Sequence, residues 1–405
     1  MSTAVLTRVA TKRWDLDSVA DTSLRAAARF WFIVTVLGQL AFAFAVASFY
    51  SLTALRGDYH GWKFSRGFVP GVTKGNWAVV MHLAAAAVIM LAGAAQLVPQ
   101  VRSHFPVFHR WNGRIYMLSA VALSAAGLYM VWIRGSVGDI TQHLGSTLNA
   151  ILIWLFAGLA LRYAMARDFK THRRWALRLF IVVSGSWFYR IGLFLTFLIF
   201  KGPVGFDPVT FNGPLISFMA FANFLFPLAI LEIYFLARGH QGARPGALRR
   251  MATAGLLFVL TLAMVAGLFG VATSAWVPQV KAAFDPRKSI AETLSATIAS
   301  SGVDAAVKQY HELKAAAPGT YNFDEGQLNA LGYRLLRARK FSEAIRILQL
   351  NVEAYPRSSN VYDSLGEAYM DDGNKPPAIA NYRKSLELNP KNRGAVAMLQ
   401  KLNAP

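Results

Sequence analysis

Cysteine is absent from the 405 residues of this chain. Its absence excludes disulfides, thiolate metal sites, iron–sulfur clusters and covalent c-type haem attachment. Acidic side chains are scarce in the first two thirds of the chain, where residues 1–280 hold 8 of them against 25 lysines and arginines. Most of these cations lie between long apolar runs, as membrane topology requires, so the charge does not indicate a nucleic-acid-binding surface. We therefore expect no nucleic-acid partner.

Hydrophobic residues, in contrast, make up 55% of the chain, a share typical of membrane proteins. Residues 1–29 are polar and basic and lack the pattern of a cleaved secretory signal, so we expect a retained first span. Seven apolar runs follow, each near the ~20 residues that cross a bilayer. They cover residues 30–55, 77–100, 114–133, 143–164, 175–200, 211–237 and 251–277. The sequence predicts an all-α bundle of seven transmembrane helices over residues 30–277.

Lysine and arginine in the short connections predict the orientation of this bundle. With the N-terminus inside, the inner connections hold seventeen basic residues and the outer ones six. We therefore expect a multi-pass protein of a bacterial inner membrane, in contact with lipid, whose residues 1–29 are cytoplasmic. An odd number of spans places the C-terminus in the periplasm.

The C-terminal part changes character after a short linker expected at residues 278–288. Leu331-Gly332, Ala344 and Pro356 recur 34 residues later as Leu365-Gly366, Ala378 and Pro390. A degenerate earlier unit shares Ala306 and Pro318. This period resembles that of tetratricopeptide repeats, which stack helix pairs into a solenoid. Residues 289–405 are thus expected to form a soluble helical solenoid that either recruits a protein partner or packs on its own membrane domain.

Four of the eight histidines fall near the ends of four successive apolar runs within residues 77–200. His82 and His109 are 27 residues apart, and His143 and His172 are 29 apart. A helix rises 1.5 Å per residue, so the members of each hairpin lie near opposite membrane faces. His82 and His143 then share the outer face, and His109 and His172 share the inner face.

Two histidines at each face suggest two b-type haems, each held non-covalently by an axial imidazole on either side of the iron. His82 with His143 and His109 with His172 are the predicted iron ligands. Cations that can meet haem propionates accompany them: Arg110, Arg114, Arg173, Arg174 and Arg178 near the inner pair, and Arg190 near the outer pair. Alanine and glycine in the second and third runs leave room for a flat macrocycle.

Each of these features has a structural alternative. Histidine, arginine and tryptophan at helix ends are comfortable in the membrane interface, and small residues serve helix packing. Zinc is a weaker candidate, because two histidines per face are too few for a closed site. Glu232 is the one acidic residue inside a predicted span, and we expect it to pair with an inner-side arginine or to handle protons. The loop at residues 55–76, with His60, Trp62 and Lys63, is a candidate cover for the outer site.

The segment from His82 to Arg178, with HRWNGRIY and HRRWALRL, resembles a bacterial membrane-protein family known as domain of unknown function 2306. The resemblance would cover roughly residues 35–240 and implies topology without chemistry. One histidine on each of four successive helices, paired second with fourth and third with fifth, also resembles cytochrome b561-type di-haem proteins. That resemblance implies that His82, His109, His143 and His172 are axial ligands. A seventh helix and a fused repeat array depart from it.

The resulting expectation is a membrane protein that binds two b haems and passes electrons across the bilayer. A quinol, with quinone as a possible cofactor, or a small soluble reductant would be the redox partner. The repeats would recruit a protein partner. The alternative from another class is a haem-free scaffold or assembly protein that acts through the repeats. A third, a transporter, would require polar or broken helices in the middle of the membrane.

Overall fold

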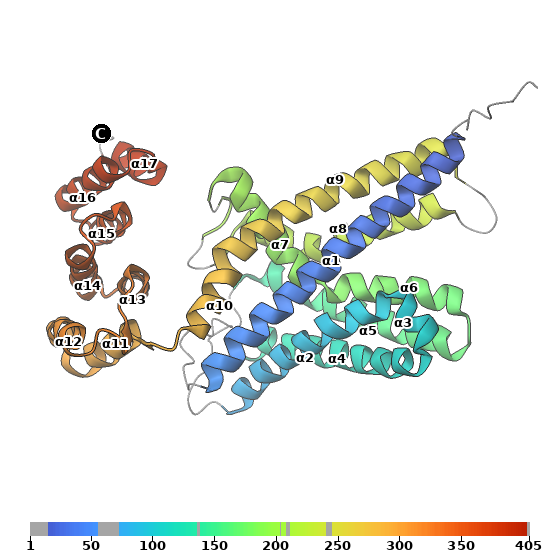
Figure 1. Cartoon of the computed structure of the whole chain (residues 1–405), viewed down its shortest axis with the longest axis horizontal. Coiled ribbons are helices and arrows are strands. Elements are labelled where there is room, and N and C mark those ends of the chain that lie inside the picture. The colour runs from blue at the N-terminus through green and yellow to red at the C-terminus, as the bar shows by residue number, and fades with distance from the viewer. Residues whose placement is uncertain are drawn as a thin grey trace, which may run out of the picture. The chain divides into compact units, whose positions relative to one another are not determined.

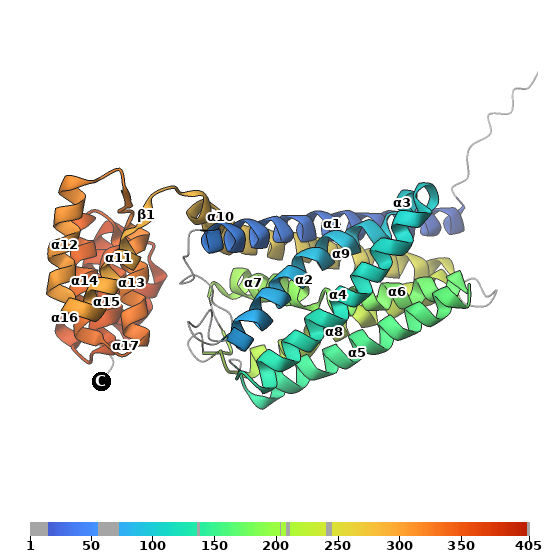
Figure 2. The same cartoon turned by 90° about the horizontal axis from the view of Figure 1, so that it is seen from below.

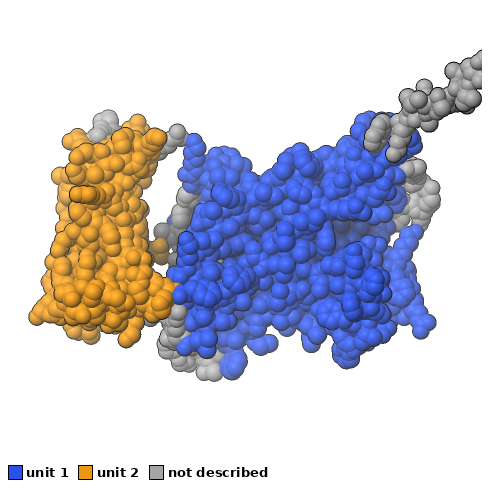
Figure 3. Space-filling view, in the orientation of Figure 1, with its two compact units in different colours: residues 1–284 blue, residues 285–405 orange. Residues whose placement is uncertain are grey.

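The computed structural model describes residues 15–55, 73–135, 138–202, 204–207, 211–239 and 245–402. Residue contacts divide the chain into two compact units, coloured separately in Figure 3. We call Met1–Phe284 the membrane unit and Asp285–Pro405 the repeat unit. Helices dominate both. The predicted all-α fold, a membrane-type helix bundle followed by a helical solenoid, is therefore confirmed.

The membrane unit consists mainly of long apolar helices (Figure 1). They are α1 (Leu16–Leu55), α2 (Thr73–Leu97), the short α3 (Pro99–His104), α4 (Pro106–Trp132), α5 (Ile140–Met165), α6 (Phe169–Val183), α7 (Gly185–Phe200), α8 (Pro214–Arg238), α9 (Ala247–Val271) and α10 (Val277–Phe284). A π-helical turn, Ala272–Trp276, joins α9 to α10. Among the described residues, six helices are long and apolar enough to cross a membrane, and α6 with α7 makes a seventh if the two form one span.

The fifth run, expected to form a single helix over residues 175–200, is broken. It starts earlier, at Phe169, and bends by 51° at Ser184, between α6 and α7. The sequence at the bend is Val182-Val183-Ser184-Gly185-Ser186, and β-branched residues followed by a Ser/Gly pair weaken a helix. The buried Nε2 of Gln39 in α1 donates to Ser184 Oγ at 2.8 Å, which stabilises the bent conformation.

Helices α1 and α9 pack side by side and run in the same direction (Figure 1). Asp21 meets Arg250 near their starts, and Phe42 stacks on Trp276 near the other end, with ring centroids 5.3 Å apart. Parallel first and last spans require an odd number of crossings, which agrees with counting α6 and α7 as one span. We call the two ends of the membrane unit the Arg250 end and the Trp276 end.

Two expected boundaries fall inside helices. The first helix begins at Leu16 rather than at Phe30, with Asp17 in its first turn, where a carboxylate favours the helix dipole. Residues 277–284, most of the expected linker, form α10, which packs on α1. Pro278 has no backbone N–H to donate within this continuous helical segment, and the π-helical turn Ala272–Trp276 lies directly before it.

Four helices close a ring within the membrane unit, as the view in Figure 2 helps to follow. Helix α2 packs on α4, α4 on α5, and α5 on α6, while Gly93 of α2 lies against the ring of Phe180 in α6. Tyr116, Ala120, Phe156 and Leu179 belong to the buried core inside the ring. Helix α2 is therefore opposite α5, and α4 is opposite α6.

The repeat unit stacks helix pairs of similar length. They are α11 (Ile290–Ser301) with α12 (Val303–Ala316), α13 (Glu325–Arg337) with α14 (Phe341–Ala354), and α15 (Ser359–Asp371) with α16 (Lys375–Leu388), followed by α17 (Arg393–Leu402). Two short parallel strands, β1 (Lys288–Ser289) and β2 (Tyr321–Asn322), pair beside the first helix pair. A Cβ on Gly332 would lie 2.6 Å from Leu348, so the repeated glycine permits close packing of the pair.

The prolines of the repeat stand just beyond the second helix of each pair. Pro318, Pro356 and Pro390 each follow the last residue of α12, α14 and α16 by two positions. A proline there cannot continue the helix, so it fixes the point at which the chain turns to the next pair. The 34-residue period thus predicted the helix ends of this unit.

Glu367 in α15 carries a pH-dependent contribution to the stability of the repeat unit. Burial raises the pKa of this carboxyl above its ordinary value of 4.5, although Tyr333 Oη donates to its Oε2 at 2.6 Å and opposes the rise. A carboxyl whose folded-state pKa is raised favours folding below its ordinary pKa, and this contribution is lost as the pH rises through the folded pKa.

We therefore expect Glu367→Gln to raise the unfolding midpoint of the full chain at pH 8 by a few degrees, since about 1 kcal/mol shifts a domain of this size by roughly 4–8 °C. The gain should shrink toward pH 5. Differential scanning fluorimetry at both pH values measures the difference between variant and wild type. Glu312→Gln, on an exposed side chain, is the control and should show no such trend. An equal gain at both pH values would contradict the assignment to Glu367 ionisation.

Candidate functional site

His109 and His172 lie together at the Arg250 end of the ring of four helices. Helix α4 already begins at Pro106, and α6 begins at Phe169 with Asp168 capping it, since the Asp168 carboxylate accepts from the Thr171 N–H at 3.0 Å. Both histidines are therefore helical although they precede the apolar cores. They lie on opposite helices of the ring and within electrostatic range of one another.

The imidazole of His172 has a fixed orientation. Its Nδ1 lies 2.9 Å from the carbonyl oxygen of Ala160 in α5, and a carbonyl can only accept, so Nδ1 carries the proton. In a neutral ring Nε2 is then left as the electron-pair donor, which is the arrangement found in metal-binding histidines. Nδ1 of His109 is buried and has no hydrogen-bond partner among the described residues. His172 Nε2 and His109 Nδ1 are therefore the ring nitrogens available to a ligand at this end.

His143 lies at the Trp276 end, in the first turn of α5. Asp139 caps that turn by accepting from the Gln142 N–H at 2.9 Å. Hydrogen bonds, chiefly from the Gln142 N–H and Ser217, hold the pKa of Asp139 below its usual range, so the capping carboxylate stays ionised. Nε2 of His143 is buried without a hydrogen-bond partner in the described part of the chain, and the ring meets Trp132 edge-on, with centroids 5.6 Å apart.

His82 lies on α2, the helix opposite α5, which carries His143. Its imidazole hydrogen-bonds to the backbone of Leu123 in α4, and its Cε1 lies 3.9 Å from the position that a Cβ of Gly127 would take. His82 thus contacts α4 at Leu123 and near Gly127, and His143 contacts it at Trp132, which is five to nine residues, or roughly 7–13 Å, farther along the helix.

Some of the arginines predicted to meet haem propionates already contact other side chains, whereas others do not. Arg178 donates to both carboxylate oxygens of Glu232, at 2.6 and 2.9 Å, and stacks on Trp175. Pairing with an inner-side arginine was one of the two roles expected for Glu232. Because Arg178 is engaged by Glu232, it is not available to a haem propionate. Arg174 stacks on Phe235 and Arg114 on Trp111. Arg110 and Arg173 are exposed at the same end and remain available to an anion.

Arg190 lies in α7 among aromatic groups of the Trp276 end. Its guanidinium interacts electrostatically with His82, Tyr50 and Tyr189, and stacks over Phe42 at 5.1 Å from the ring centroid. Its Nη1 donates to the Ser186 carbonyl at 2.8 Å. The expected neighbourhood of Arg190 and His82 is therefore present.

A polar layer surrounds the bend at Ser184, and sequence reasoning missed it. A Cβ on Gly185 would lie 2.6 Å from Oδ1 of Asn223 and 3.4 Å from Nδ2 of Asn149. Gln39 Oε1 and Asn149 Oδ1 are buried without hydrogen-bond partners among the described residues, so they require water or a ligand. Pro227 in α8 leaves the Asn223 carbonyl without its helical donor. A broken helix beside polar groups is also what the transporter alternative requires.

The remaining site predictions concern metal ions and the first outer loop. No group of three or more histidine, aspartate or glutamate side chains that could hold a metal ion occurs within the described ranges. Haem iron requires only two axial side chains, so paired histidines suit haem better than zinc. The predicted cover of the outer site, with His60, Trp62 and Lys63, lies outside the described residues.

Comparison with known proteins finds a family model for part of the membrane unit and short matches to two other proteins. Residues 79–226 match the family described as "Predicted membrane protein (DUF2306)". Human Superkiller complex protein 3 is 38% identical over 61 residues, which is 15% of this chain and 4% of that protein. The mouse protein of the same name is 40% identical over 55 residues, 14% of this chain and 4% of that protein. The chain thus spans only a small fraction of these relatives.

These matches support a membrane domain within residues 79–226, which includes the four histidines, and give a weak indication of tetratricopeptide-like repeats. They do not support the resemblance to cytochrome b561.

Proposed function

We propose that the membrane unit binds b-type haem between paired histidines and passes electrons across the bilayer, while the repeat unit recruits a protein partner. The observation that carries the proposal is the pair His109 and His172. These imidazoles come from opposite helices, one is oriented by the Ala160 carbonyl, and the other has a buried nitrogen without a partner. Two such donors fit the axial positions of a haem iron.

The chain's own residues would hold the cofactor at two levels. His109 and His172 would be the ligands at the Arg250 end, where Arg110 and Arg173 can neutralise propionates. His82 and His143 would be the ligands at the Trp276 end, with Arg190 as the cation there. Haem, when bound, supplies a one-electron redox centre. Along α5, His143 and Ala160, the residue that orients His172, are 17 positions apart, roughly 25 Å and close to the thickness of the hydrocarbon layer.

The proposal extends to orientation and partners. The arginine-rich Arg250 end would face the cytoplasm, and the Trp276 end and the repeat unit would face the periplasm of a bacterial inner membrane. A quinol or a small soluble reductant would be the redox partner. The second candidate function is a haem-free membrane scaffold, which the helical solenoid favours because such arrays bind partner proteins.

We expect the detergent-purified full chain, expressed with ample haem, to show a reduced-minus-oxidised b-type spectrum with about two haems per chain by pyridine haemochrome. His172→Ala and His82→Ala should each lose about one haem. His104→Ala is the matched control, because His104 is exposed and hydrogen-bonded locally to Ser103 and Gln100. Colourless wild-type protein would refute haem binding and leave the scaffold function. Loss of haem in His104→Ala equal to that in His172→Ala would refute the assignment of ligands.

A further inference from the structure

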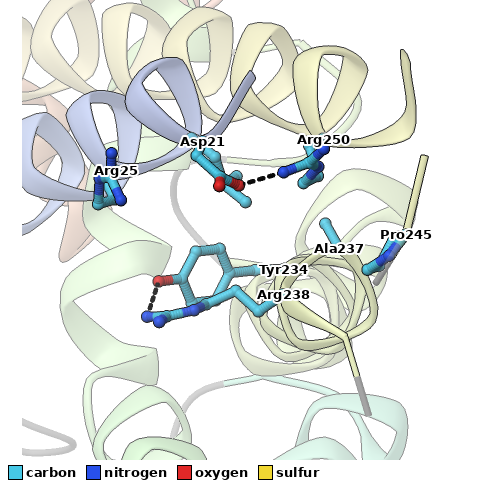
Figure 4. Close-up of a pocket in the computed structure, with 8 residues that line it drawn as sticks. Asp21, Arg25, Tyr234, Ala237, Arg238, Pro245 and Arg250 are labelled. Carbon is cyan, nitrogen blue, oxygen red and sulfur yellow. Dashed lines mark hydrogen bonds and ion pairs between the residues drawn. The ribbon is translucent and has the colours of Figure 1, made fainter. Parts of the chain in front are cut away.

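A cavity of about 230 Å³ opens at the Arg250 end, between α1, α8 and α9 (Figure 4). Asp21, Leu24 and Arg25 of α1 line it on one side, and Tyr234, Ala237 and Arg238 of α8 line it on another. Pro245 and Arg250 also line it. Its volume lies below the roughly 300–1,000 Å³ typical of sites for drug-sized ligands, so it suits a small headgroup-sized occupant.

Basic side chains outnumber acidic ones around this cavity. Arg250 is 2% exposed and forms ion pairs with both Asp17 and Asp21, so these carboxylates are already engaged. Among the described residues, neither Arg25 nor Arg238 forms an ion pair. Arg238 and Arg102 both lie close enough to Arg173 for their positive charges to repel its guanidinium. The cavity is therefore electropositive, and an anion inside it would relieve repulsion between arginines.

Three side chains that line the cavity carry hydrogen-bond donors (Figure 4). Arg25 is exposed and bonds only to Thr22 among the described residues. Nη1 of Arg238 donates to the Tyr234 hydroxyl oxygen at 3.2 Å. Since that oxygen accepts from Arg238, the Tyr234 hydroxyl keeps its own proton to donate to a third group. Two guanidinium groups and one phenol form a donor set suited to a tetrahedral oxyanion.

The depth of the cavity places it among lipid headgroups. The predicted hydrocarbon-spanning part of α1 begins at Phe30, and Arg25 lies five residues before it, roughly 7–8 Å along the helix. The headgroup layer is about 5–8 Å thick on each side of the hydrocarbon. Arg238 is the last residue of α8 and therefore lies at a similar depth. Phosphate is the anion that every phospholipid carries at this level.

We propose that this cavity binds a phosphate group through Arg25, Arg238 and the Tyr234 hydroxyl. The occupant is a phosphate whose charge is not neutralised by its own cation, as in an anionic phospholipid or free inorganic phosphate. No histidine of the described ranges lines the cavity, so phosphate binding here does not depend on haem.

Native mass spectrometry of the full chain, released from detergent with phosphatidylglycerol, phosphatidylcholine or inorganic phosphate, tests the site. Wild type is expected to retain phosphatidylglycerol at least tenfold better than phosphatidylcholine. The Arg25→Gln/Arg238→Gln double variant should lose this preference, and Tyr234→Phe should weaken it several-fold. Arg249→Gln removes a neighbouring exposed arginine that does not line the cavity, and it should retain the preference.

Each outcome decides between the occupants or against the site. Phosphatidylglycerol binding that inorganic phosphate does not displace identifies a lipid headgroup, whereas displacement by millimolar phosphate identifies a free anion. Equal binding of both lipids to wild type would overturn the proposal. Equal loss in Arg249→Gln and the double variant would also overturn it, because general surface charge would then explain the binding. If the double variant is not recovered folded, Tyr234→Phe alone decides, and an unchanged preference there rejects the donor set.

Discussion

Replacing Gly267 by valine is expected to abolish most of the folded membrane unit. Gly267 in α9 is buried against α7, and a Cβ there would lie 2.5 Å from the carbonyl oxygen of Ile191 and 2.7 Å from its Cγ2. The first of these atoms belongs to the backbone of α7 and cannot rotate away, so the two helices would have to separate. Overpacking of a core costs about 1–3 kcal/mol, and more when the obstacle is backbone.

The same helix offers a matched control for this substitution. Gly255 has no atom within 4 Å of the position of its Cβ, so Gly255→Val adds the same side chain to open space. Fluorescence-detected size-exclusion chromatography after heating measures the surviving folded fraction. We expect Gly255→Val to survive like wild type and Gly267→Val to lose most of its monodisperse peak. Similar profiles for the two variants would show that α7 and α9 do not pack as closely as described.

Glu232→Ala is expected to destabilise the membrane unit by roughly 2–4 kcal/mol, because it leaves the Arg178 guanidinium without a counter-charge among apolar neighbours. This loss of stability is smaller than that from breaking a fully buried ion pair, because 40% of the Glu232 side chain is exposed. Arg178→Ala should destabilise by a similar amount. Replacing both residues by methionine should recover most of the loss, since no unpaired charge then remains.

A double-mutant cycle over Glu232→Ala, Arg178→Ala and the double alanine variant measures the coupling between Arg178 and Glu232. The midpoint of unfolding in a mixed-micelle denaturant titration is the observable for each variant. Arg114→Ala removes an exposed arginine that stacks on Trp111 without pairing to an acid among the described residues, and it serves as the control. Additive effects of the two single substitutions would argue against a stabilising ion pair.

Hydropathy predicted the spans of the membrane unit because a bilayer requires about 20 apolar residues from every crossing helix. The repeat period likewise predicted the helix ends of the repeat unit, because Pro356 and Pro390 cannot continue a helix. The sequence predicted that Glu232 would pair with an arginine of the inner side, since few arginines lie at its depth in the membrane. These features depend on properties that each segment carries in its own residues.

Other features depend on contacts between distant segments, which composition does not reveal. The bend at Ser184 is stabilised by Gln39, 145 positions earlier in the chain. The basic cavity requires Arg25 of the first helix to meet Arg238 of the eighth. The helical placement of His109 and His172 depends on α4 and α6 starting before their apolar cores, a boundary that capping by Asp168 decides for α6. The axial role of the four histidines stays a prediction.

The bend at Ser184 divides one membrane crossing into two helices that differ in the helices they pack against. Helix α6 packs with α5 and α8, whereas α7 packs with α9 and α8. Helix α7 is 16 residues long, a lever of roughly 24 Å, so a change of about 5° at its pivot would displace Phe200 by roughly 2 Å. His172 and Arg190 therefore lie on the two arms of one bent crossing, and the hydrogen bond from Gln39 to Ser184 lies where the arms meet.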